Sequence, residues 1–88
     1  MIQIIYSDRA IKNLSSLDRQ VSKRVVRKIE EYGGTTNPLL YAKALSGSLI
    51  GMYRYRVGDY RVLFEIDTSG AVTILVILNI KHRKDVYR

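Results

Sequence analysis

The chain has 88 residues and a formal net charge of +7. A chain of this length folds as one domain around a small core, which excludes a deep, enclosed small-molecule pocket. It contains no Cys and one His, which excludes disulfides, thiol nucleophiles and multi-His metal centres. We therefore expect a single domain over residues 1–88 that uses neither a metal nor another cofactor.

The charge excess comes from 15 Lys and Arg against eight Asp and Glu, and it is spread over both halves of the chain. It predicts a polyanionic partner, most commonly nucleic acid, because each phosphate that is neutralised releases a counterion. An anionic membrane is the rival partner, but the chain starts without cations and its longest apolar run is about half a bilayer span. We expect a cytoplasmic protein that does not bind membranes; a general role of the charge in solubility is the alternative.

Residues 1–6 are β-branched and aromatic enough to predict a first strand. Apolar residues at helical spacing then predict two tightly joined helices, with cap candidates at 7–8 and again at 16–18. The glycines at 33–34 end the second helix. Cations line the polar side of this helix, and we interpret them as an ordinary solvated face.

From about residue 52 the apolar period changes to two, which predicts two strands joined by a type II′ turn at 58–59. In that register Arg56 lies directly across from Arg61, and Arg54 points to the same face. Like charges in such a position are destabilising by up to about 1 kcal/mol. No acidic residue separates these three side chains, so an anion from outside the chain would relieve the conflict.

The apolar run at 71–80 predicts a last strand that is central in the sheet and covered on both faces. In an antiparallel meander its end lies beside the hairpin, so Lys81, His82 and Arg83 extend the cationic groove. Tyr87 can fold back over it. The predicted architecture is α+β: an N-terminal strand, a two-helix hairpin and an antiparallel three-stranded meander, with the helices on one face of a small antiparallel sheet.

Such a groove can do only the chemistry of its residue types. Arginine binds phosphate and stabilises developing negative charge but transfers no proton. Lys81, His82 or Tyr87 would act as the base or acid. RNA brings its own 2′-hydroxyl nucleophile, so a metal-free cationic site favours RNA over DNA. In the ordinary structural interpretation, Arg56 and Arg61 are solvated, His82 bonds the end of its strand, and Tyr87 packs on the core.

The segments LSGSLIGMYRYRVGDYRVLFEI, at 45–66, and VILNIKHRKDVYR, at 76–88, resemble the RelE/ParE superfamily of bacterial and archaeal toxins. The predicted order of elements fits that superfamily over the whole chain. The resemblance implies a RelE-like microbial RNase fold and a toxin of a type II toxin–antitoxin pair. RelE-like members cut mRNA in the ribosomal A site and leave a 2′,3′-cyclic phosphate, whereas ParE-like members inhibit DNA gyrase and are not known as nucleases.

Residue by residue, the resemblance implies that Arg61 is the phosphate-stabilising arginine and Tyr87 the tyrosine near the attacking hydroxyl. Lys81, where an arginine is usual, and Arg83 would form the basic pair that closes the site. The lysines of well-studied RNA-cleaving members are replaced in this chain, so their proton transfer would pass to other groups. The predicted substrate contacts are Arg54 and Arg56, at those lysine positions, and His82.

The function implied by the resemblance is a ribosome-dependent mRNA endonuclease that needs no metal. A gyrase inhibitor without nuclease activity and a non-catalytic, antitoxin-bound nucleic-acid binder are the alternatives. The expected partners are the ribosome, mRNA and an acidic, RelB-like antitoxin. The apolar positions of the second helix and the edge of the first strand are its predicted docking surfaces.

Overall fold

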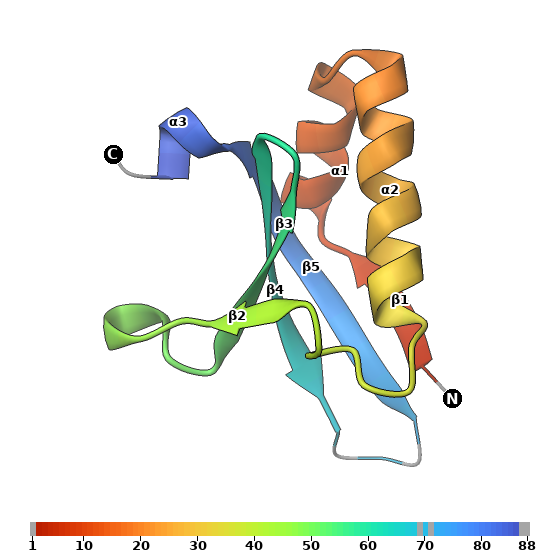
Figure 1. The fold of residues 1–88 in the computed structure, drawn as a ribbon, viewed down its shortest axis with the longest axis vertical. Coiled ribbons are helices and arrows are strands. Elements are labelled where there is room, and N and C mark those ends of the chain that lie inside the picture. Colours follow the sequence, from red (N-terminus) through yellow and green to blue (C-terminus); the bar gives the residue numbers. More distant parts are fainter. Residues whose placement is uncertain (1, 69, 71, 87–88) are drawn as a thin grey trace.

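The computed structural model describes residues 2–68, 70 and 72–86, and Figure 1 shows its fold. Among the described residues, no helix is both long and apolar enough to cross a bilayer. The elements in chain order are β1 (Ile2–Tyr6), α1 (Asp8–Ser16), α2 (Arg19–Gly33), β2 (Ala42–Ala44), the 3₁₀ turn η1 (Gly47–Leu49), β3 (Met52–Val57), β4 (Tyr60–Asp67), β5 (Thr73–His82) and α3 (Arg83–Val86).

The strands form one five-stranded sheet in the order β1-β5-β4-β3-β2. Helices α1 and α2 lie side by side against one face, while α3 and the segment after β2 project on the other side (Figure 1). The predicted α+β architecture is confirmed. The sheet is mixed rather than antiparallel, because β1 pairs in parallel with β5; the two helices supply part of the long connection that parallel pairing requires.

The helix boundaries follow from capping residues that the sequence contains. The Ser7 hydroxyl accepts a hydrogen bond from the Ala10 N–H at 3.1 Å at the start of α1, and Asp18 caps α2 in the same way. Helix α2 ends at Gly33, as predicted, and this residue is buried. A Cβ there would lie 2.6 Å from Leu75 Cδ1, so a larger residue would force the Leu75 side chain to shift within the core.

The core lies between the helices and the sheet. Tyr55 is fully buried, and its hydroxyl donates to the Pro38 carbonyl at 2.6 Å. Burial raises the pKa of Tyr55 to about 12. Val25 and Ile29 of α2 are also fully buried. The prediction that the apolar positions of this helix dock a partner is therefore wrong for these two residues, since the chain's own sheet covers them.

The hairpin of β3 and β4 has the predicted register, with Arg56 opposite Arg61. Gly58 opens its turn with φ +57°, a backbone conformation that a type II′ turn requires at this position. Strand β2 was not predicted; its three residues pair with β3 and place Lys43 opposite Arg54.

The prediction that the last strand is covered on both faces is wrong. Strand β5 lies between β1 and β4, but only Leu75, Ile77 and Ile80 are buried in it. The side chains on the other face are partly exposed, because α1 and α2 cover one side of the sheet only. The apolar run therefore marks an interior strand without a second covering layer.

The spacing of the buried residues in β5 changes from two to three because of a β-bulge. The pairing with β4 shifts by one residue between Leu63 and Phe64 and leaves Leu78 as the extra residue. The Leu78 carbonyl accepts a hydrogen bond from the Ser7 hydroxyl at 2.8 Å. The Ile80 N–H donates to Asn13 Oδ1 at 2.9 Å. Helix α1 and its cap thus satisfy the backbone that the bulge removes from the ladder.

Candidate functional site

Cations gather on the sheet face that the helices leave open. Cross-strand neighbours share a face, and residues two apart along a strand are about 7 Å from each other. The pairings therefore define two adjacent rows on this face. The first row runs across β3, β4 and β5 and consists of Arg56, Arg61 and Lys81. The second row runs across β2 to β5 and consists of Lys43, Arg54, Leu63 and Asn79.

Arg61 is the most constrained of these cations. Arg61 is only 8% exposed, and its Nη1 donates hydrogen bonds to the carbonyls of Gly58 and Tyr60, each at 3.0 Å. Within the described part of the chain it forms no ion pair with a carboxylate. A buried charge is costly unless an opposite charge compensates it. The turn therefore holds in place a guanidinium group that lines the pocket and has no carboxylate partner among the described residues.

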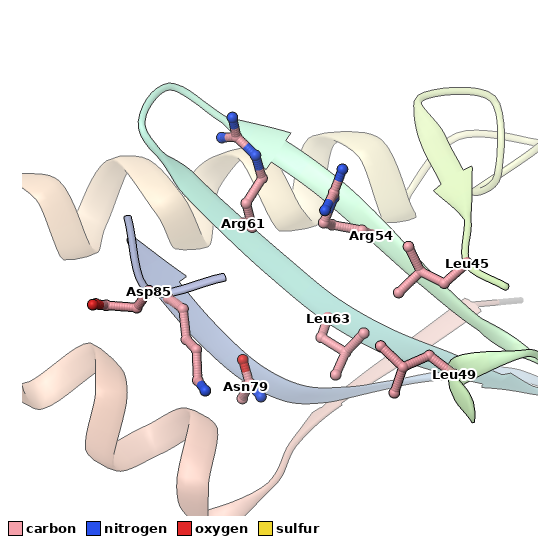
Figure 2. Close-up of a pocket in the computed structure, with 8 residues that line it drawn as sticks. Leu45, Leu49, Arg54, Arg61, Leu63, Asn79 and Asp85 are labelled. Atoms are coloured by element: carbon pink, nitrogen blue, oxygen red, sulfur yellow. The ribbon is translucent and has the colours of Figure 1, made fainter. Parts of the chain in front are cut away.

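A pocket of about 210 Å³ lies on this face, and Figure 2 shows its lining. The side chains of Leu45, Leu49 and Leu63 gather at one end of it. The rest of the lining is polar: the cations Arg54, Arg61 and Lys81, the amide Asn79 and the carboxylate Asp85. The pocket therefore combines an apolar wall with a cluster of cations.

Of the predicted site residues, the structure brings Arg54, Arg61 and Lys81 together in this pocket. Arg56 lies beside Arg61 on the same face but is exposed and is not part of the lining. Tyr87 lies outside the described residues.

The structure does not bring His82 into the pocket. It pairs with Tyr60 on the helix side of the sheet, and the two rings meet edge to face at 5.3 Å between centroids. Its Nδ1 accepts a hydrogen bond from the Lys84 N–H at 3.2 Å. These contacts agree with the structural alternative, in which His82 bonds the backbone near the end of its strand.

Arg83 is also outside the pocket lining. Its backbone N–H donates to the Asp59 carbonyl at 2.7 Å, and its Nε lies 3.6 Å from Asp59 Oδ1. Both side chains are more than half exposed, so the ion pair itself contributes little to stability. The two contacts nevertheless tie the start of α3 to the hairpin turn, next to the pocket.

Several residues in or beside the pocket were not predicted. Lys43 was missed because β2 was not predicted. Asn79 was missed because strict alternation from Leu75 would have placed it in the core. Asp85 was missed because its neighbours in the terminal segment are mostly cationic. Figure 2 shows its carboxylate directed away from Arg54. No group of three His, Cys, Asp or Glu side chains among the described residues is arranged to hold a metal.

The fold and the site define a small α+β protein with a cation-lined pocket on an open sheet face. Residues 4–87 match the profile of the "ParE toxin of type II toxin-antitoxin system, parDE". The chain therefore belongs to this toxin family, within the RelE/ParE superfamily.

Relatives and solved structures agree with this assignment. Over 51 residues the chain is 43% identical to Toxin RelG of Mycobacterium tuberculosis; the match covers 58% of this chain and 56% of the relative, about half its length. The fold is similar to the toxin–antitoxin complex RelBE2 of the same organism (TM-score 0.74, 28% identity, 92% of this chain and 96% of that one). It is also similar to the RelB–RelE antitoxin–toxin complex of Methanococcus jannaschii (TM-score 0.69, 25% identity, 94% of each chain). The predicted RelE-like fold is confirmed.

Proposed function

We propose that this toxin is a metal-independent endoribonuclease that cuts mRNA on the ribosome, in the cytoplasm, and thereby stops translation. The observation that carries this proposal is Arg61: a buried guanidinium fixed by backbone carbonyls, without an acidic partner among the described residues. A side chain in that state stabilises an anion better than a mobile surface cation does, because little reorganisation is needed.

The pocket supports a reaction with a balanced set of steps. The scissile phosphate lies against Arg61, with Arg54 and Lys81 beside it. A base takes the proton of the 2′-hydroxyl, O2′ bonds to phosphorus, and the bond to O5′ breaks as O5′ receives a proton. The products are a 2′,3′-cyclic phosphate and a 5′-hydroxyl. The cations stabilise the dianionic phosphorane between these steps.

Proton transfer in this site falls to groups other than arginine. Lys81 lines the pocket directly. Asp85 adds a carboxylate at its edge, and it forms no ion pair with any described residue. Tyr87 remains a proposed participant on the strength of the family resemblance. We propose Lys81, Asp85 and Tyr87 as the groups among which the base and the acid are found.

Inhibition of DNA gyrase is the second candidate function, and the match to the ParE profile favours it. Induction of the toxin followed by mapping of transcript ends, together with a gyrase supercoiling assay, separates the two. The nuclease proposal expects cuts inside reading frames and unchanged supercoiling.

Arg61→Lys and Arg61→Ala test the site itself, with Arg9→Ala on the exposed part of α1 as the matched control. We expect both Arg61 variants to lose about 100-fold or more in cleavage, because lysine keeps the charge but lacks the fork that the turn carbonyls hold. Circular dichroism checks that each variant is folded. Full cleavage by folded Arg61→Ala would overturn the nuclease proposal.

An antitoxin is the proposed partner, since the similar structures are complexes of toxins with antitoxins. Strand β1 is an edge of the sheet, and its Ile5 is 46% exposed. An extended antitoxin segment could add to this edge while acidic side chains of the antitoxin face the cations. Deletion of the antitoxin gene should make the toxin gene lethal on induction, and co-expression should restore growth.

A further inference from the structure

We propose that the pocket holds the base of one nucleotide against its leucine wall, with the phosphate of that nucleotide on the cations, and that Asn79 reads the edge of the base. This inference rests on the proposed function and names the part of the substrate that sets its sequence preference. The leucine wall consists of Leu45, Leu49 and Leu63.

The order of residues across the sheet places a leucine between a cation and an amide. Leu63 lies between Arg54 on β3 and Asn79 on β5, its direct neighbours in the second row. The first row, with Arg61 and Lys81, runs about 7 Å away. One nucleotide covers that span from phosphate to base. Since a water takes about 30 Å³ of liquid volume, a pocket of about 210 Å³ has room for a single base.

The leucine wall is an exposed apolar surface on which a nucleobase can pack. Leu49 is 41% exposed, although it stands beside cations rather than in the core. Figure 2 shows its side chain directed toward Leu63, with Arg61 at the opposite end of the pocket. A nucleobase has an apolar face and a polar edge, so it covers leucine side chains while its edge stays open to hydrogen bonds. Inorganic phosphate would use only the cations.

Asn79 has the free hydrogen-bonding groups that recognition of a base edge needs. It lies inside a long strand, where asparagine is disfavoured, so it is not there to support the sheet. Its carboxamide carries both donors and an acceptor, and it makes no hydrogen bond to another described residue. Asparagine recognises a base through a pair of such bonds. The β-bulge turns this side chain toward the pocket instead of the core.

Titration of the purified toxin with the four 5′-mononucleotides and with inorganic phosphate tests the inference, followed by NMR of the leucine methyl groups and the Asn79 side-chain amide. We expect the nucleotides, but not phosphate, to shift the methyl signals of the leucine wall. The dissociation constants of the four nucleotides should differ from one another. Asn79→Leu should reduce the ratio of the largest constant to the smallest, called the spread, by about fivefold or more. Leu49→Ala should weaken all four by roughly threefold. Leu40→Ala is the matched control, since Leu40 is 63% exposed and outside the pocket.

The outcomes separate this inference from the proposed function. Methyl shifts no larger with nucleotides than with phosphate, or an unchanged spread in Asn79→Leu, would overturn the base site. Nucleotide binding at the leucine wall by a toxin that cuts no RNA would leave the inference standing and remove the nuclease. Mapping of transcript ends gives the converse result. If Asn79→Leu still cuts RNA with an unaltered base preference, the nuclease proposal stands and the role of Asn79 is removed.

Discussion

Gly58 connects the conformation of the hairpin turn with the position of the site cation. Its φ of +57° is unfavourable for any residue with a Cβ, and its carbonyl is one of the two that hold Arg61. A Cβ at this position would also lie 3.3 Å from Nη2 of Arg24 on α2. Gly58→Ala therefore strains the turn and moves one support of the guanidinium group.

The size of both effects follows from these contacts. A left-handed backbone conformation costs a residue other than glycine about 1–2 kcal/mol, and stability should fall by that amount. A hydrogen bond to a charged group contributes about 1.5 kcal/mol or more. If Arg61 loses the bond to Gly58, the fraction of molecules with the guanidinium group in its productive position falls about tenfold. RNA affinity or cleavage should fall by about that factor.

Gly51→Ala is the matched control. Gly51 also has a positive φ, +92°, and a Cβ there meets nothing within 4 Å. Urea unfolding followed by circular dichroism should show a comparable loss of stability in both variants, whereas the single-turnover cleavage rate and RNA affinity should fall only in Gly58→Ala. Equal activity of the two variants would refute the inference that the turn positions Arg61.

Three further predictions concern other parts of the molecule. Asn13→Ala should lower the free energy of unfolding by about 1–3 kcal/mol, because it leaves the Ile80 N–H without its acceptor; urea unfolding measures this. Burial raises the pKa of Tyr55 from 10.0 to about 12, so the unfolded chain loses the proton first and stability should fall as the pH rises from about 10 to 12. Tyr55→Phe should flatten that fall in pH-dependent unfolding. Lys43→Ala should reduce the salt slope of RNA binding by roughly 0.7, whereas the exposed Lys12→Ala on α1 should not; a slope unchanged in Lys43→Ala would remove Lys43 from the RNA-binding face.

Much of the fold could be predicted from local signals. The caps and Gly33 set the helices, and the turn residues set the register of the hairpin, so the placement of Arg56 opposite Arg61 was correct. These features depend on residues close together in the sequence. The parallel pairing of β1 with β5 joins distant segments and has no local signal, and β2 is too short for its period to be recognised.

The site was predictable where alternation held and not where it was interrupted. Lys81 was correctly placed beside Arg61, since both lie close to strand ends that the hairpin register fixes. His82 was grouped with it only because the two are neighbours in the sequence, although successive side chains of a strand point to opposite faces. Asn79 and Asp85 carried no charge pattern or motif that marked them as pocket residues.

The irregularity in β5 decides which side chains of the strand reach the pocket. Upstream of Leu78 the odd-numbered side chains face the helices, and downstream the even-numbered ones do. If the strand paired regularly without the bulge, the upstream alternation would continue and carry the ammonium group of Lys81 into the hydrocarbon interior. One extra residue at Leu78 therefore lets a single strand present Ile77 and Ile80 to the interior and Asn79 and Lys81 to the pocket.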